Sequence, residues 1–185
     1  MKKIIISLAL AAVAVFGANA QIGVGVGYGT KTFSTNGLDD LGGLYVGATY
    51  NLELSQGLCV APGVDLAFYS ADKNNVKTKE SYLAIPVLFN YAIPVADIIK
   101  IVPFAGPTVS LGLSSKSEVG SITADRYDDT DYGRFDLLIG GGVALDVNDM
   151  IRVSVGYNKG LLNRNTGDGT KITTGGVHFG VAYLF

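Results

Sequence analysis

Few residues of this chain have the types and spacing that catalysis or metal binding requires. His178 is the only histidine and Cys59 the only cysteine, so no histidine–cysteine cluster can hold a transition metal and no intramolecular disulfide can form. We expect Cys59 to pack as a small, buried apolar group. No serine–histidine–carboxylate set and no pair of carboxylates has supporting context. We therefore expect no enzyme activity, no metal and no cofactor, and we expect His178 to be a hydrogen-bonded interior residue.

Two further patterns resemble ligand sites and have simpler explanations. Four aspartates share the longest polar stretch: Asp125, Asp128, Asp129 and Asp131. Carboxylates at this spacing can bind Ca²⁺, but the glycine and terminal glutamate of an EF-hand loop are missing, so we favour a solvated loop. The glycine repeat near Gly23 resembles a dinucleotide-binding loop, but no helix pattern follows it. Neither pattern predicts a ligand.

Five charged residues fall inside apolar stretches instead of polar ones: Glu53, Asp65, Arg134, Asp136 and Arg152. In each stretch the charge lies on the face that carries glycine and other small residues. Both signs are present, so these side chains can neutralise one another where water is scarce. We expect an interior salt-bridge network that holds the fold rigid. The alternative is the lining of an ion or solute path.

The stretches around these charges alternate between apolar and small or polar residues, which is the period of a β-strand with one apolar face. Eight of them occur, at 22–29, 44–53, 58–69, 82–91, 100–113, 134–145, 151–158 and 177–185. The fifth is the least regular, because its two prolines cannot donate ladder hydrogen bonds and Phe104 falls on the face of Thr108 and Ser110. The pattern therefore leaves the register of this stretch open.

The composition of the two strand faces indicates which one meets water. A soluble sandwich or lipocalin-like barrel hides its apolar face, and its exposed strand face is usually charged. Here the second face carries mostly glycine, alanine, serine and threonine, which suit the narrow interior of an eight-stranded barrel. The apolar face then meets lipid, and closure pairs every backbone N–H and C=O. We predict an all-β fold, a closed antiparallel up-and-down transmembrane β-barrel of about eight strands.

The connections between the strands alternate in length. Long polar connections span 36–42, 70–79, 114–132 and 163–171, and short ones span 55–57, 94–99 and 148–149. Short periplasmic turns and long outer loops are the rule for outer-membrane barrels, so we expect both termini in the periplasm. Aromatic residues on the apolar face, such as Tyr28 and Tyr157, are consistent with girdles at the two membrane interfaces.

The amino-terminal segment is typical of a signal peptide. It has a basic start, an apolar run over 4–16 and a small-residue cleavage motif at 18–20. We expect residues 1–20 to be removed, which leaves one domain of residues 21–185. Loss of two lysines with this segment changes the formal charge from −2 to −4, so nucleic-acid binding gains no support.

Several motifs from Tyr82 onward follow one another in a characteristic order: Tyr82–Leu88 with its Ile-Pro pair, Pro103–Pro107, Arg134–Val143 and Val155–Leu161. The chain ends in an alternating segment with Tyr183 and Phe185. Together these motifs resemble the porin-like outer-membrane β-barrel family of Gram-negative bacteria, in which such a carboxy terminus is the assembly signal. The resemblance implies an outer-membrane location, contact with membrane lipids and lipopolysaccharide, and recognition by the barrel assembly machinery. It implies no defined solute.

Three functions are compatible with these patterns. The first is a structural or surface-interaction barrel with a largely packed lumen and long loops that meet extracellular partners. The second is a small porin-like pore for solutes, and the third is a secreted, soluble, lipocalin-like barrel for an apolar ligand. We favour the first and expect a monomer. Because some eight-stranded membrane barrels are hydrolases, residue order alone leaves an enzyme as an alternative.

Overall fold

The computed structural model describes residues 20–185 except 36–38, 74–75, 120–121, 129–131 and 168. The described residues form eight long strands: β1 (Ala20–Phe33), β2 (Leu41–Ser55), β3 (Leu58–Lys73), β4 (Val76–Tyr91), β6 (Ile99–Val119), β8 (Phe135–Val147), β9 (Ile151–Gly160) and β10 (Thr174–Leu184). Two short strands, β5 (Ile93–Ala96) and β7 (Ile122–Asp125), pair with the two ends of β6. The expected signal peptide lies outside the described residues except for Ala20, where β1 begins. Within the described ranges, no helix is long and apolar enough to cross a membrane.

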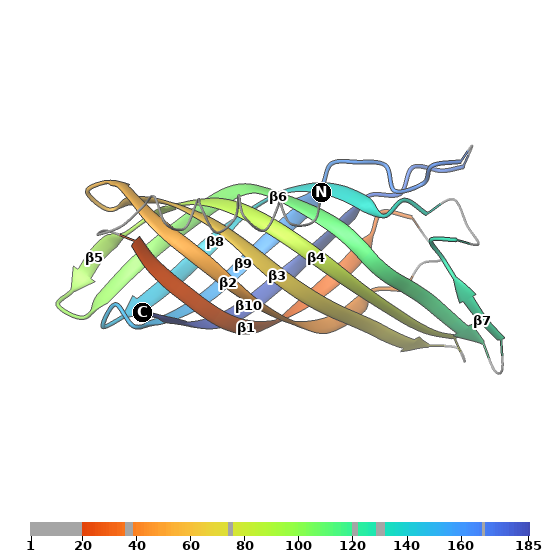
Figure 1. The fold of residues 1–185 in the computed structure, drawn as a ribbon, viewed down its shortest axis with the longest axis horizontal. Helices are drawn as coiled ribbons and strands as arrows, with labels where there is room; N and C mark the ends of the chain where they lie inside the picture. The colour runs from red at the N-terminus through yellow and green to blue at the C-terminus, as the bar shows by residue number, and fades with distance from the viewer. Residues whose placement is uncertain (1–19, 36–38, 74–75, 120–121, 129–131, 168) are drawn as a thin grey trace, which may run out of the picture.

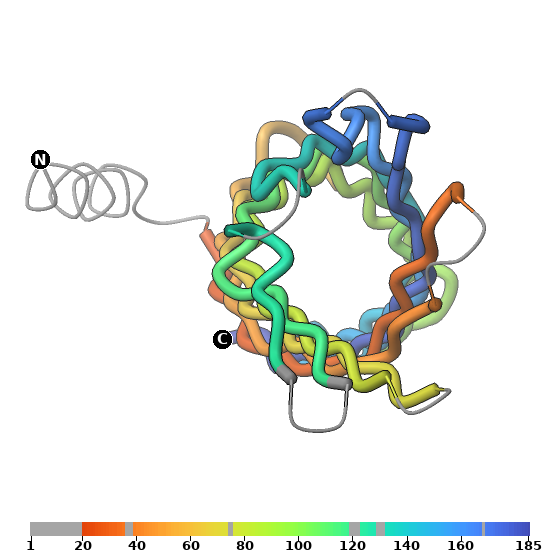
Figure 2. Tube along the Cα trace, turned by 90° about the vertical axis from the view of Figure 1, so that its right-hand side faces the viewer, coloured from red at the N-terminus to blue at the C-terminus, as the bar shows by residue number. Residues whose placement is uncertain are grey.

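Each of the eight long strands pairs with two antiparallel neighbours, so the sheet closes on itself. Neighbours follow chain order once β5 and β7 are set aside, and the β1–β10 pair, with Val26 opposite Val181, completes the ring. The view along the barrel axis shows this ring directly (Figure 2). The predicted closed up-and-down barrel of eight strands is confirmed.

Most outward side chains of the barrel are apolar, and those nearest the long loops are polar. Val26 of β1 is 61% exposed and Leu44 of β2 is 65% exposed, whereas the residues between such positions are small or polar and face the interior. Contact with water would cost about 25 cal/mol for each Å² of this apolar surface, so the face is suited to acyl chains. A soluble lipocalin-like barrel would turn these side chains inward. The structure therefore supports the predicted orientation.

The irregular fifth stretch forms β6, the longest strand of the barrel (Figure 1). Phe104 faces the interior, and both prolines of the stretch are exposed. Leu113 is an extra residue opposite the step from Ser81 to Tyr82 of β4, which makes a β-bulge. The bulge shifts the alternation, so Ser115 points inward and is fully buried. This shift places the Ser115 hydroxyl inside the barrel, near the Val119 end of β6.

Short turns close one end of the barrel, the short-turn end, and longer hairpins and loops form the other, the long-loop end (Figure 1). Asn148 and Asp149 have φ values of 56° and 54°, the signs that a type I′ hairpin turn requires. The predicted long connections over 70–79 and 114–132 are partly wrong, because β3, β4, β6 and β7 extend into them. β1 begins and β10 ends at the short-turn end, which faces the periplasm in outer-membrane barrels.

The glycine face of β1 makes room for a large side chain in the lumen. Tyr45 of β2 lies across Gly27 and Gly180, and its hydroxyl donates to the Phe179 carbonyl oxygen at 3.2 Å. A Cβ atom at Gly27 would collide with the Tyr45 ring. The glycines predicted to face a narrow interior thus accommodate aromatic side chains that fill it.

Candidate functional site

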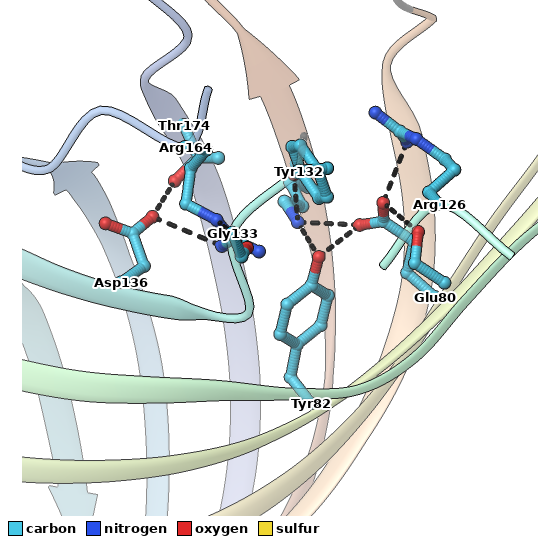
Figure 3. Close-up of polar contacts among 10 residues, drawn as sticks. Glu80, Tyr82, Arg126, Tyr132, Gly133, Asp136, Arg164 and Thr174 are labelled. Atoms are coloured by element: carbon cyan, nitrogen blue, oxygen red, sulfur yellow. Dashed lines mark hydrogen bonds and ion pairs between the residues drawn. The ribbon is translucent and has the colours of Figure 1, made fainter. Parts of the chain in front are cut away.

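Buried charged and aromatic side chains cross the lumen at the long-loop end. We call this cluster the plug; its members are Lys31, Glu80, Tyr82, Ser115, Arg126, Tyr132, Asp136, Arg164 and Thr174 (Figure 3). The members within strands come from β1, β4, β6, β8 and β10. Arg126 and Tyr132 lie in the connection before β8, and Arg164 lies in the connection after β9. Lys31 and Glu80 belong to strands separated by β2 and β3, so the bond between them spans the interior.

Glu80 is the centre of the plug. Its Oε2 accepts hydrogen bonds from Lys31 Nζ at 2.6 Å and from the Tyr82 hydroxyl. Its Oε1 accepts from Ser115 Oγ and from Arg126 Nη1, each at 2.9 Å. The Glu80 side chain is fully buried, and both of its oxygens are satisfied by charge-assisted bonds. Such a carboxylate holds three strands and a loop in one arrangement.

Tyr132 connects two loops at the long-loop end of the barrel, the loop before β8 and the loop before β10. The guanidinium carbons of Arg126 and Arg164 lie 4.3 and 4.6 Å from the centroid of its ring, within the range of cation–π contacts. Burial, followed by the charge of Glu80, raises the pKa of the Tyr132 phenol, which therefore stays protonated at neutral pH. Tyr132 also bridges to Asn165 through the backbone. The ring is thus held between two cations.

Arg164 ties the loop before β10 to the loop before β8 and to the barrel wall. Its Nε donates to the Gly133 carbonyl at 2.7 Å, and its backbone carbonyl accepts from the Gly133 N–H at 2.7 Å. Its Nη1 lies 3.6 Å from Asp136 Oδ2, which also accepts from Thr174 Oγ1 at 2.7 Å. The side chains of Arg164 and Asp136 are each 1% exposed. This pair closes the lumen on the side opposite Glu80.

A second ion pair lies near the short-turn end. Arg152 Nε and Nη2 each lie 2.7 Å from one oxygen of Asp146, which is a bidentate pair. Arg152 Nη1 also donates to Asn51 Oδ1 at 3.3 Å, and Asn51 accepts from Asn90. The lumen is therefore bridged by polar side chains at both ends.

The five charged residues predicted to form one network lie in separate places, so that prediction is wrong. Glu53 is exposed and lies two residues past Asn51 toward the short-turn end. Arg134 is also exposed, and its Nη2 pairs with Asp128 Oδ1 at 2.8 Å. Asp136 belongs to the plug, and Arg152 belongs to the ion pair with Asp146 near the short-turn end. Asp65 is half-buried between these two groups. Among the described residues, no ion pair joins two of the five. Interior charges do pair, but with partners that the prediction missed.

The missed residues lie where the sequence indicated loops or strand ends. Lys31 continues the inward parity of the β1 glycines by one step, and Glu80 continues that of Tyr82 and Ala84 in β4. Extending the alternation past each apolar run would have found both. Arg126, Tyr132 and Arg164 lie outside the strands, and no periodic signal marks them.

The remaining predicted residues have mixed outcomes. His178 faces the lumen beside Phe104, as expected, and its Nδ1 has no partner among the described residues, so its hydrogen bonding stays a prediction. Cys59 is half-buried instead of buried. Asp125 and Asp128 bond Tyr127 and Arg134, and Asp129 and Asp131 lie outside the described residues.

The carboxy-terminal pair has the geometry of an exposed aromatic contact. Tyr183 and Phe185 pack edge to face with ring centroids 4.8 Å apart, and Phe185 is 71% exposed. The Phe185 N–H donates to the Ile22 carbonyl, which fastens the end of the chain to β1. Recognition of these two residues during assembly stays a prediction, and so does the aromatic girdle.

The family of this barrel follows from a comparison over nearly its whole length. The model of the outer membrane protein β-barrel domain matches residues 4–185. The chain belongs to this family. This outer-membrane barrel is therefore surrounded by membrane lipid, as its outward apolar face requires. No curated protein sequence matches it.

Solved structures share the fold of this outer-membrane barrel at low identity. The attachment invasion locus protein Ail of Yersinia pestis is similar with a TM-score of 0.56 at 11% identity, over 91% of this chain and 100% of Ail. Neisserial surface protein A gives 0.56 at 17% identity, over 91% and 98%. The outer membrane enzyme PagL gives 0.54 at 14% identity, over 86% and 97%. Because one of these is an enzyme, the fold alone leaves catalysis open.

Proposed function

We propose that this outer-membrane barrel has a structural or surface-interaction role, with a largely packed lumen that is closed to solutes and long loops that meet extracellular partners. The observation that carries the proposal is the plug. Lys31 and Glu80 bridge the lumen at 2.6 Å, and Arg126 holds the second oxygen of Glu80 from a loop. Barrels of this class hold either a water-filled channel or an interior closed by loops and side chains, and buried ion pairs favour the second.

The proposal includes lipid and lipopolysaccharide as surroundings, insertion by the barrel assembly machinery, and a monomer. It includes no enzyme activity, because His178 Nδ1 bonds neither a carboxylate nor a hydroxyl of the described residues. Ail and Neisserial surface protein A are named for attachment and for a surface location. A surface role for this chain would agree with both.

A small pore is the second candidate, and a cavity of about 100 Å³ beneath the plug, lined by both polar and apolar side chains, favours it. A solute would still have to pass Glu80, Asp136 and Arg164, whose side chains are almost completely buried. The pore therefore requires the plug to open, whereas the closed barrel requires no movement.

Liposome swelling in small sugars tests the proposal. The wild-type barrel should leave swelling at the level of empty liposomes, and the double variant Arg126→Ala/Arg164→Ala should swell them, because both side chains leave the mouth while the strands stay unchanged. Arg134→Ala is the matched control, since this exposed arginine lies outside the plug. Retarded mobility after heating on a gel would show that each variant is folded. Swelling by the wild type at the rate of the double variant would contradict a closed lumen.

A further inference from the structure

Lys159 of β9 is a cation on the lipid-facing side of the barrel. Its side chain is exposed, and Tyr157 precedes it on the same outward face. Tyr157 and Leu161 flank it along the chain, Ile139 of β8 lies opposite it, and all three side chains are about half exposed. Its partner on the other side is Gly175 of β10. With these neighbours, the aliphatic stem lies among acyl chains while the ammonium group reaches toward the lipid headgroups.

The described part of the chain supplies no anionic partner for Lys159. Other lysines do have one: Lys31, Lys73, Lys79 and Lys100 each form an ion pair with a carboxylate at 2.6 to 3.1 Å. The side chain of Lys159 forms neither an ion pair nor a hydrogen bond with any described residue. Its ammonium group is therefore available to an anion from outside the chain.

Gly175 leaves an open position beside this lysine, which we call the Gly175 notch. A Cβ atom at Gly175 would lie 2.8 Å from the Tyr157 hydroxyl oxygen and 3.5 Å from Thr32 Oγ1. Thr32 Oγ1 donates its proton to the Gly175 carbonyl at 3.1 Å, whereas the Tyr157 hydroxyl bonds none of the described residues. A phenol that can donate and an ammonium group therefore flank one open position on the outer face.

We propose that Lys159 and Tyr157 bind the phosphate group of an outer-leaflet lipid at the Gly175 notch. Lys159 lies one residue from the Gly160 end of β9, at the long-loop end, so the headgroups it meets are those of the outer leaflet. Phosphate fits, because its oxygens accept from both an ammonium group and a phenol, and charge-assisted bonds are the stronger kind. The inference rests on the lipid surroundings of the proposed function and names the lipid group that one site on the barrel recognises.

A second glycine on the outer face provides an internal comparison. The hydroxyl of Tyr28 lies over Gly42 of β2, as that of Tyr157 lies over Gly175. The residues opposite Gly42 are Thr30 of β1 and Ser70 of β3, and neither is charged. This position therefore has the phenol without the cation, and we expect it to leave phosphate unbound.

Titration of phosphatidic acid into phosphatidylcholine nanodiscs that hold the refolded barrel tests the site. Phosphatidic acid presents a phosphate monoester, whereas a choline cation covers the phosphate of the host lipid. The amide resonances of Lys159 and Gly175 should shift saturably, and that of Gly42 should not. Equal shifts with diacylglycerol, which lacks the phosphate, would overturn phosphate recognition. Equal shifts with inorganic phosphate alone would overturn a lipid as its source.

Variants separate this site from general attraction between the barrel and charged lipid. Lys159→Gln removes the cation, so half-saturation at Gly175 should need about tenfold more phosphatidic acid, and Tyr157→Phe, which removes only the phenol donor, about threefold more. Lys79→Gln, on the outward face of β4, is the matched control and should leave half-saturation unchanged. An unchanged value in Lys159→Gln, or an equal loss in Lys79→Gln, would overturn the proposal. Closure of the lumen is measured separately by liposome swelling, so the two proposals can fail independently.

Discussion

Glu80 is the residue on which closure of the long-loop end depends most. It receives two cations, a phenol and a serine hydroxyl while its own side chain is fully buried. Charge pairs buried to this degree add little over an apolar packing of equal volume, but removal of one partner strands the other charge away from water. The consequence of losing the carboxylate is therefore larger than the net value of the bond.

Glu80→Gln tests this asymmetry. The amide keeps the shape of the side chain but leaves Lys31 without a counter-ion, so the free energy of unfolding should fall by about 3–5 kcal/mol. Urea titration of the refolded barrel, followed by the folded fraction on an unheated gel, would measure the change.

The matched control is Glu118→Gln, which removes the partner of Lys79 on the outer surface. Both side chains of that pair are substantially exposed, at 51% and 35%, so the loss should be about 0–1 kcal/mol. Equal losses in the two variants would contradict a buried, essential carboxylate at Glu80.

Only part of this site was accessible from sequence. The inward positions of Asp136 and Arg152 follow from strand alternation, and both do lie in interior pairs. The partner of Asp136 does not follow, because Arg164 lies in a loop. Asp146, the partner of Arg152, continues the inward parity of Asp136 and Ala144 but lies one residue past the predicted stretch, which ends at residue 145. Interior pairing depends on which strands face each other across the lumen, and alternation within one strand contains no such information.

The short turn at 148–149 is the element whose backbone most restricts residue type. Asn148 and Asp149 both have positive φ, which asparagine and aspartate tolerate and β-branched residues do not. The turn joins β8 to β9, and Asn148 N–H donates to the Ile98 carbonyl. Its geometry therefore sets the register of two strands and supports a third.

Asn148→Val should destabilise the barrel by about 1–3 kcal/mol, because a β-branched residue is strained at positive φ. Asn148→Gly removes the same side chain without that strain and should change stability by less than about 1 kcal/mol. Urea titration of the two variants measures the difference. A valine variant as stable as the glycine variant would show that the turn is not held in this conformation.

The strands themselves were largely predictable, and their ends were not. Alternation located all eight, because lipid on one side and a narrow lumen on the other impose a period of two along the part of each strand that crosses the membrane. The method fails where the outer side chains become polar, so β3, β4 and β6 continue past their expected ends. The bulge at Leu113 also escapes it, since an extra residue changes the parity without any composition signal.

At the scale of the whole molecule, the barrel separates two environments. Acyl chains surround its outer face, and side chains fill its lumen. Leu66 lies on the outward face near the middle of β3, and Ser70 lies on the same face four residues closer to the long loops. The two positions differ in depth but share a strand and a face. They therefore form a matched pair for measuring what surrounds the barrel.

Leu66→Arg should cost about 2–4 kcal/mol in lipid vesicles, because a cation in the middle of the hydrocarbon layer is poorly solvated. Ser70→Arg should cost only about 0–1 kcal/mol, since the interface solvates the charge. The measurement is the free energy of unfolding in vesicles. Equal costs at the two depths would mean that β3 does not cross hydrocarbon as described.

Closure of the lumen by the plug is tested most directly by planar-bilayer recording of the refolded wild-type barrel. Ions are smaller than the sugars used in liposome swelling, so the recording sets the stricter condition. We predict no steady single-channel steps at any moderate voltage, because Glu80, Asp136 and Arg164 occupy the mouth as buried, paired groups. Stable, uniform conductance steps from the wild-type protein would show a continuous water path and would contradict the plugged barrel.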